Sequence, residues 1–197
     1  MSLKKIKTLI IFITIILFVA NKSVLASEAI INKAIDYLGN IKFFSASFIQ
    51  SDSETVSEGR LFIGSKRIRV EYSKPSKILI ILDSDKAMYY NYELDEDEFF
   101  NPKKTSAWFF YDTFKNAALI KKSKFEKKDN NLIIYQQGEN ELGNYKINVF
   151  FENNPMIIRK IVLLIDETKL ILSFFDHKYN ETFDKNFFKL INPTLLN

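Results

Sequence analysis

The sequence predicts a mainly β (α+β) protein, built on one large, strongly curved antiparallel sheet with an N-terminal helix and a central helical insertion. From Phe43 onward, apolar residues alternate with polar ones in short segments, which is the period of a strand. Turn residues separate these segments, and no Pro/Gly/Ser linker or fixed repeat interrupts them. With 197 residues, 47% of them hydrophobic and 26% charged, the chain suits a single core rather than two domains.

Residues 1–26 have the layout of a secretory signal peptide. Lys4, Lys5 and Lys7 precede an apolar run from Leu9 to Ala20, and small or short residues lead to a predicted cut after Ala26. The run is short for a bilayer, which needs about 20 apolar residues. An uncleaved membrane anchor is the alternative. Cleavage would leave residues 27–197 as a single domain in an extracytoplasmic space such as a periplasm.

The charge distribution argues against a nucleic-acid partner. The formal charge is +4, but residues 1–26 contain four lysines and no acid, so residues 27–197 carry 24 basic and 24 acidic groups. The chain has no Cys, which excludes disulfides, thiolate metal sites, a thiol nucleophile and a lipidated N-terminal Cys.

One amphipathic helix is predicted to open the domain. Ser27 and Glu28 resemble a helix start, and apolar residues then recur at helical spacing over 29–38 until Gly39. The strand-like segments that follow are 43–51, 57–64, 66–73, 76–82 and 86–92.

The third of these segments shows which face is covered. Ile68, Val70 and Tyr72 share one face, whereas the residues between them are charged. One apolar face and one solvent-exposed face are typical of an antiparallel sheet that is covered on one side.

The second half of the chain repeats this pattern after a helical insertion. The acidic stretch from Glu93 to Glu98 is interpreted as a solvated loop, and residues 105–119 as a short helix with an aromatic face. Further strands are predicted at 122–127, 131–137, 143–152, 156–166 and 169–176, with a weaker one near 178–188. This gives about eleven strands.

The sequence offers little catalytic chemistry, and we predict no enzyme activity, cofactor or metal site. The single histidine, His177, has no G-x-S-x-G serine to activate. The acids of residues 95–98 lack the glycine and terminal glutamate of a calcium loop, and no glycine-rich phosphate loop is present. The lysines of 121–128 have acids nearby and no interleaved aromatics, so they are interpreted as a wet hairpin.

Aromatic residues are abundant, with 19 Phe, 9 Tyr and 1 Trp. All of these side chains could belong to an ordinary hydrophobic core. A curved sheet that does not close can instead enclose a cavity, and an apolar cavity suits an apolar ligand. Composition does not decide between the two.

Four consecutive stretches resemble the LolA family of periplasmic lipoprotein carriers. The stretch 44–50 matches the family's F-x-A-x-F-x-Q strand, and 59–63 resembles its G-x-L-x-hydrophobic strand. The stretch 67–75 is similar to the F-R-W-x-Y-x-x-P-like strand, and 80–91 to the strand pair around its S-D-G turn. The resemblance is clearest over 27–92.

The resemblance implies an open, eleven-stranded half-barrel with a helical lid, whose apolar hollow carries lipoprotein acyl chains from the inner to the outer membrane. Implied partners are lipoproteins with acylated N-termini, an inner-membrane lipoprotein-releasing ABC transporter and a LolB-type receptor, with the carrier itself monomeric. The helices 29–38 and 105–119 would gate the hollow. The residues expected to line it are Phe48, Leu61, Ile63, Ile68, Val70, Trp108 and Phe110.

An arginine is expected to latch the lid. The family's K-R-P turn corresponds here to Gly64-Ser65-Lys66-Arg67, which is one residue shorter and has no Pro. Arg69, which matches the F-R-W arginine, and Arg67 are therefore both candidates.

Two other functions remain as alternatives. An outer-membrane receptor of the LolB type shares the fold, but such receptors are lipoproteins and this chain has no Cys. A periplasmic hydrolase or ligand-binding module of another class would need paired acids on one strand face, and none are found.

Overall fold

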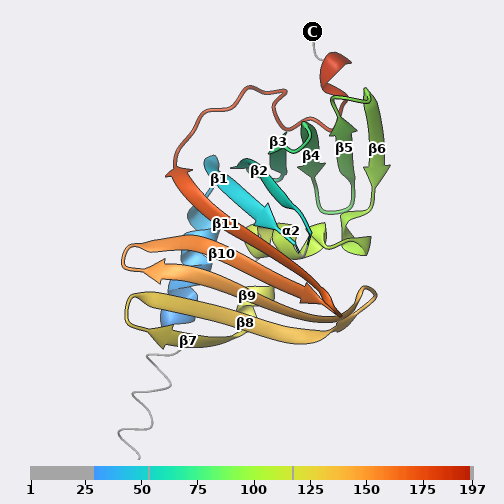
Figure 1. Ribbon diagram of the computed structural model, residues 1–197. Helices are drawn as coiled ribbons and strands as arrows, with labels where there is room; N and C mark the ends of the chain where they lie inside the picture. The colour runs from blue at the N-terminus through green and yellow to red at the C-terminus, as the bar shows by residue number, and fades with distance from the viewer. Residues whose placement is uncertain (1–28, 53, 117, 196–197) are drawn as a thin grey trace, which may run out of the picture.

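A single antiparallel sheet of eleven strands forms the body of the protein (Figure 1). The computed structural model describes residues 29–52, 54–116 and 118–195. The spatial order of the strands is β6-β5-β4-β3-β2-β1-β11-β10-β9-β8-β7. Their bounds are β1 Phe44–Ser51, β2 Val56–Ile63, β3 Ile68–Lys74, β4 Ile78–Leu82, β5 Ala87–Asn91, β6 Glu96–Phe100, β7 Lys124–Lys128, β8 Asn131–Asn140, β9 Gly143–Asn153, β10 Met156–Ile165 and β11 Thr168–Lys178.

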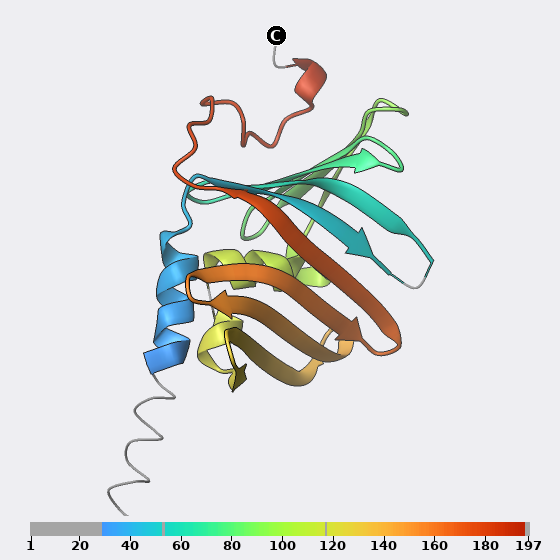
Figure 2. The ribbon, with the colours of Figure 1, turned by 60° about the vertical axis from the view of Figure 1, so that its left-hand side comes forward.

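The sheet is open, with β6 and β7 at its two edges. Its strands fan around a concave inner face, where α2 (Ala107–Lys115) lies between the two halves of the sheet (Figure 2). This confirms the predicted fold class of a curved half-barrel with helices. The predicted signal peptide, residues 1–26, lies outside the described residues.

The predicted number of strands is right, but two of the assignments are wrong. The acidic stretch interpreted as a loop contains β6, which pairs with β5 at the sheet edge. Its acids can stay in water there, because an edge strand needs no apolar face. The weak strand expected near 178–188 is absent, since β11 ends at Lys178 and the chain then leaves the sheet.

The main core lies on the inner face of the sheet. In antiparallel pairs, directly opposite residues point to the same face. Leu61 lies opposite both Ala46 and Val70, and Ile63 lies opposite Ile68. Phe48, Leu61, Ile63 and Ile68 are each at most 5% exposed and belong to one continuous apolar cluster. The alternation seen in the sequence therefore places one apolar face of the sheet under the helices.

The connection between β6 and β7 supplies the helices of the inner face. It consists of η1 (Pro102–Lys104), α2 and α3 (Ala118–Lys121), and of these α2 falls entirely within residues 105–119, the range predicted to be helical. Phe109 and Phe114 of α2 are buried in the main core. The carboxylate of Asp112 accepts the amide of Leu119 at 2.9 Å, which fixes the turn from α2 into α3.

The N-terminal helix (residues 29–40) packs beside the barrel rather than inside it (Figure 2). Ala34 and Leu38 are buried in the core, and Tyr37 contacts Phe151 edge-on at 6.1 Å. The amide of Ile158 donates to the Tyr37 hydroxyl at 3.3 Å, which joins the helix to β10. Among the described residues, no helix has the length and apolarity needed to span a membrane.

Gly59 of β2 leaves room for two groups that lie close to its α-carbon, the Glu71 carbonyl of β3 and the Phe48 ring of β1. A Cβ added there would collide with the Glu71 carbonyl oxygen and would lie 2.6 Å from the Phe48 ring. We predict that Gly59→Ala lowers the free energy of unfolding by about 1–3 kcal/mol, measured by chemical denaturation, because the sheet must shift to admit the methyl group.

Gly39→Ala is the matched control. A Cβ there meets nothing within 4 Å, and the residue is helical. This substitution should be neutral or stabilise by up to about 1 kcal/mol. Equal losses in the two variants would contradict the packing argument.

Candidate functional site

An apolar cavity of about 160 Å³ lies between α2 and the inner face of the sheet. Its walls come from β1 to β4, from β11 and from α2. The lining residues are Phe48, Gln50, Leu61, Ile68, Val70, Tyr72, Ile80, Leu82, Ser106, Ala107, Phe110, Phe114, Leu170, Leu172 and Phe174. None of these side chains is charged.

Most of the residues predicted to line a hollow meet at this cavity. Phe48, Leu61, Ile68, Val70 and Phe110 are among its lining residues. Ile63 is fully buried in the core outside the lining. Trp108 also lies outside it, because its ring stacks on Tyr111 with centroids 5.5 Å apart.

Two of the polar side chains of the cavity wall, Tyr72 and Gln50, are paired with each other. The hydroxyl of Tyr72 donates to the side-chain oxygen of Gln50 at 2.8 Å, and the Tyr72 ring packs edge-on against Phe48 at 5.2 Å. Burial raises the pKa of Tyr72 to about 12, so this hydroxyl stays neutral at physiological pH. The cavity therefore offers an apolar ligand a wall without an unpaired charge.

The cavity is too small for a typical ligand while α2 is in place. Ligand pockets usually measure about 300–1,000 Å³, whereas this one holds about 160 Å³. A long apolar ligand can enter only if α2 moves away from the sheet. Helix α2 therefore has the position of the predicted lid, and it is called the lid from here on.

Two side chains of α2 hold the lid to the turn between β2 and β3. The hydroxyl of Tyr111 donates to the Lys66 carbonyl at 3.1 Å, and the ammonium of Lys115 donates to the Gly64 carbonyl. Tyr111 and Lys115 are four residues apart, so they lie on the same face of the helix. Neither residue was predicted to be functional from the sequence, although their spacing at the end of an aromatic helix was the available signal.

The two arginines expected to latch the lid bind a different element. The segment of residues 179–192, here called the C-terminal segment, crosses the outer face of the sheet after β11 (Figure 1). Arg67 donates to the Phe188 carbonyl at 3.0 Å and to Asp83 at 2.6 Å. Arg69 donates to the Phe187 carbonyl at 2.8 Å, and its guanidinium lies 4.4 Å from the centre of the Phe187 ring.

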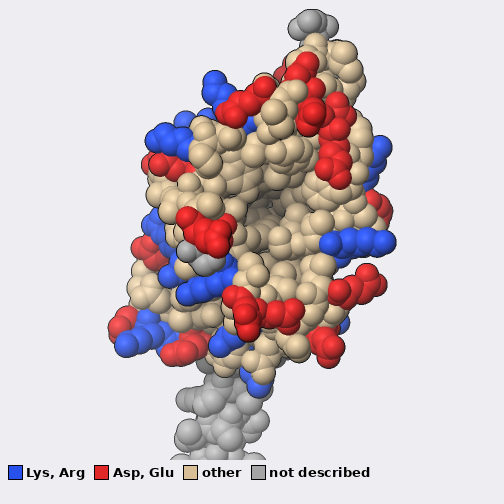
Figure 3. All heavy atoms as spheres, turned by 45° about the vertical axis from the view of Figure 1, so that its right-hand side comes forward, with Lys and Arg blue, Asp and Glu red and all other residues tan. Residues whose placement is uncertain are grey.

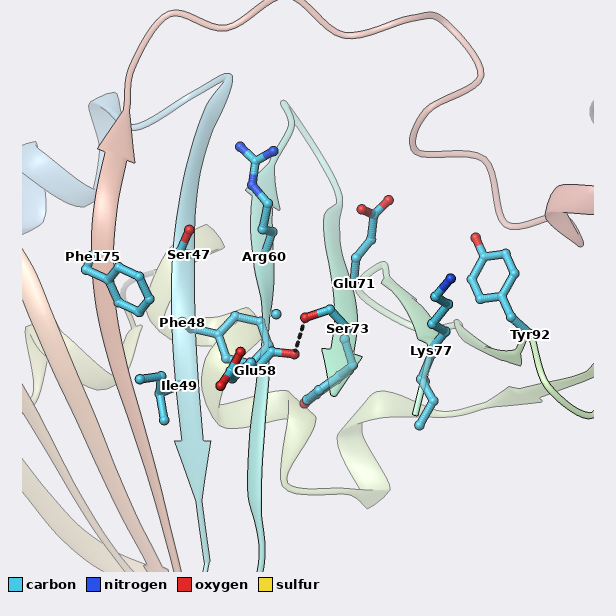
Figure 4. Close-up of a pocket in the computed structure, with 13 residues that line it drawn as sticks. Ser47, Phe48, Ile49, Glu58, Arg60, Glu71, Ser73, Lys77, Tyr92 and Phe175 are labelled. Carbon is cyan, nitrogen blue, oxygen red and sulfur yellow. Dashed lines mark hydrogen bonds between the residues drawn. The ribbon is translucent and has the colours of Figure 1, made fainter. Parts of the chain in front are cut away.

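A larger groove of about 740 Å³ crosses β11, β1, β2, β3 and β4 (Figure 4). Charged side chains of both signs lie along it, including Glu58, Arg60, Glu71 and Lys77. The hydroxyl of Ser73 donates to the Glu58 carbonyl at 3.2 Å within it. A long apolar ligand here would desolvate these charges, so chemistry favours the smaller cavity under α2.

The surface around the molecule's visible hollow carries no single strong charge. In Figure 3, mostly uncharged residues wall a central hollow, and separate acidic and basic side chains surround it. This arrangement agrees with the equal numbers of acids and bases in residues 27–197.

His177 has a structural environment. Its Nε2 lies 2.8 Å from the Ile158 carbonyl, and its ring packs 5.7 Å from that of Phe44. Burial lowers the pKa of His177 below its usual range, which favours the neutral imidazole. Among the described residues, no group of three or more potential metal ligands is found.

A protein-family comparison identifies the same relationship as the sequence motifs. The family described as "Outer membrane lipoprotein carrier protein LolA" matches residues 39–191. This range spans all eleven strands, the lid and most of the C-terminal segment. No curated protein matches the chain.

Solved structures with the same fold are distant in sequence. An uncharacterized conserved protein from Thermus thermophilus aligns with a TM-score of 0.57 at 10% identity, covering 85% of this chain and 96% of its own. A DUF1329 family protein from Desulfovibrio piger aligns with a TM-score of 0.51 at 7% identity, covering 87% and 99%. At such identities the likeness concerns the fold alone.

The half-buried Lys115 of the lid predicts a pH-dependent stability. Burial, with a contribution from Lys42, lowers the pKa of Lys115 to about 8 from its ordinary value of 10.5. Between these values the unfolded chain binds the proton that the folded chain has released, so stability rises with pH. Below about pH 8 both states bind it, and the folded state carries the full cost of the buried charge.

We therefore expect the free energy of unfolding of the wild type to gain a component that rises with pH from about 8 towards 10.5, between the folded and the ordinary pKa of Lys115. Urea denaturation at closely spaced pH values measures it. Lys115→Met keeps the length of the side chain and should remove that component. An identical pH profile in the two proteins would contradict the assignment.

Proposed function

Since this chain belongs to the LolA family, we propose that it is a carrier that binds the acyl chains of lipoproteins in the cavity under α2. We further propose that it works in the periplasm, after cleavage of a signal peptide at residues 1–26, and moves lipoproteins from the inner to the outer membrane. The chemistry is binding and release rather than catalysis.

The observation that carries this proposal is an uncharged cavity beneath a separable helix. Aliphatic and aromatic side chains line most of it, and its Tyr72 and Gln50 satisfy each other. Such a wall stabilises hydrocarbon without offering a site to a charged or strongly polar ligand.

The size of the hydrophobic effect explains why a carrier is needed. Each buried CH₂ contributes roughly 0.8 kcal/mol, so a sixteen-carbon chain in water lies about 12 kcal/mol above the same chain in an apolar site. Diffusion of a free lipoprotein through an aqueous space is therefore strongly disfavoured.

A carrier must also release its cargo, and the closed lid provides a competing occupant. In the closed structure Phe110 and Phe114 of α2 take up space at the cavity wall. The free energy gained when the lid closes reduces the apparent affinity for an acyl chain by the same amount. We propose that Arg67 and Arg69 assist the latch indirectly, by holding the turn that α2 contacts.

The proposed partners follow from the family. An inner-membrane ABC transporter would supply the lipoprotein, and a LolB-type outer-membrane receptor would accept it. The carrier would act as a monomer.

The direct experiment is identification of what copurifies with the protein. The wild type is isolated from the periplasm under mild conditions, extracted and examined by mass spectrometry. Diacylated or triacylated polypeptides should be present. Recovery of only free phospholipid or sugar, with no acylated polypeptide, would count against a lipoprotein carrier.

Val70→Glu should abolish acyl-chain binding while the sheet stays folded. The new carboxylate would face the apolar cavity, where an unpaired charge is costly, and it would be buried further under a bound chain. We expect at least about a tenfold loss in affinity for a fluorescent palmitoyl probe, with the far-ultraviolet circular dichroism unchanged.

Val56→Glu is the matched control, because Val56 is 63% exposed at the start of β2. It should bind the probe like the wild type. Normal probe binding and lipoprotein transfer by Val70→Glu would show that the cavity is not the site.

Tyr111→Phe should make the probe bind more tightly. The substitution removes the hydrogen bond from α2 to Lys66 but keeps the ring that stacks on Trp108. One such bond contributes about 0.5–1.5 kcal/mol, so weakening the closed lid should raise the apparent affinity about two- to tenfold. Fluorescence titration measures this, and weaker binding would contradict the lid's role as competitor.

A further inference from the structure

The C-terminal segment covers a second apolar surface on the outer face of the sheet. Leu79, Ile81, Met88 and Tyr90 of β4 and β5 form a buried cluster separate from the main core, and Leu190 of the segment packs against it. Earlier in the segment, Phe183 and Phe187 stack at 5.0 Å and contact Phe62 of β2 edge-on. The segment therefore acts as a strap across β2 to β5.

The strap grips the turn between β2 and β3 from the outside. Arg67, at the end of this turn, donates to the Phe188 carbonyl at 3.0 Å. The Phe188 ring lies directly against Gly64, where an added Cβ would come within 2.8 Å of it. The absence of a side chain at Gly64 is what allows the ring to sit so close to the turn.

The lid grips the same turn from the inside. Tyr111 and Lys115 of α2 donate to the carbonyls of Lys66 and Gly64. Gly64 therefore contacts both elements. Its carbonyl accepts the Lys115 ammonium of the lid, and its α-carbon lies against the Phe188 ring of the strap. The short turn of residues 64–67 is the shared support of two elements that lie on opposite faces of the sheet.

Side chains, rather than a ladder of backbone hydrogen bonds, hold most of the strap on the sheet. Residues 179–192 contain no helix or strand. In the described part of the chain, the backbone–backbone hydrogen bond that joins the strap to another segment runs from the Glu181 amide to the Phe43 carbonyl at 2.7 Å. Segments with few such bonds open locally at a lower free-energy cost than core strands.

We propose that the strap and the lid are energetically coupled through the β2–β3 turn, so that opening of the lid loosens the strap. The reverse follows by thermodynamic necessity, since a coupling free energy is the same in both directions. The part of this inference that concerns the binding of cargo rests on the proposed function. Cargo that displaces α2 would then alter the outer face, where a receptor or transporter can tell a loaded carrier from an empty one.

Hydrogen exchange on the ligand-free protein tests the coupling independently of acyl-chain binding. Phe188→Ala removes the ring that lies against Gly64 and leaves every side chain of α2 in place. The amides of residues 109–115 should then exchange at least about fivefold faster, as expected for a coupling at the low end of the usual range. The amides of β8 and β9, which lie two or more strands beyond β11 in the sheet, should be unchanged.

Leu190→Ala is the matched control. It also removes an apolar side chain of the strap, but at the cluster over β4 and β5 instead of at the turn. It should speed exchange in residues 189–192 and leave the lid amides within about twofold of the wild type, below the range expected for coupling. Equal acceleration of the lid in both variants would show general destabilisation and overturn the proposal.

Reciprocity supplies a second test. Tyr111→Phe should speed exchange of the Lys189 amide, which is bonded to Asn186 within the strap at 2.9 Å. In the double variant with Phe188→Ala, the effects on lid and strap should be non-additive. Strictly additive effects, or a strap unaffected by Tyr111→Phe, would overturn the coupling while leaving acyl-chain binding intact. Loss of probe binding with the coupling preserved would instead refute only the proposed function.

Discussion

The structure depends on one constraint: an open, curved sheet has an apolar concave face that it cannot cover by itself. A closed barrel fills its interior with its own side chains, but here β6 and β7 end the sheet without meeting. The inner faces of β1 to β4 must therefore be kept from water by something added to the sheet. That cover is α2, and beneath it a cavity of about 160 Å³ is left.

The lid and an acyl chain compete for the same apolar face, and the free energies of the two can be compared. The lid's two hydrogen bonds to the β2–β3 turn contribute about 1–3 kcal/mol together, with a further contribution from the apolar side chains of α2. Burial of a sixteen-carbon chain contributes about 12 kcal/mol relative to water. In the proposed carrier, an acyl chain would therefore gain far more than the two hydrogen bonds of the lid, and closure of the lid would lower the apparent affinity and so favour release.

The parts of the fold governed by alternation could be predicted from the sequence, and the parts governed by backbone contacts could not. The parity of Ile68, Val70 and Tyr72 correctly indicated one face, because side-chain direction in a strand has a fixed period. Strand β6 was missed since its acids lie at an edge, where the apolar pattern is not required. Tyr111, Lys115, Arg67 and Arg69 each donate to a backbone carbonyl, and such contacts carry no side-chain signal in the sequence.

The groove on the outer face shows why the candidate site is chosen by the polarity of its lining residues and not by its volume. The groove over β1 to β4 is several times larger than the cavity, at about 740 Å³, but it contains Arg60, Lys77 and two glutamates. Hydrocarbon laid there would strip water from those charges without replacing their hydrogen bonds, and that cost offsets the gain from burying the chain. Under α2 the same hydrocarbon meets mostly apolar walls, the Tyr72–Gln50 pair and Ser106, and no charged side chain. The smaller cavity is therefore the more favourable environment for an acyl chain, and displacement of α2 would enlarge it.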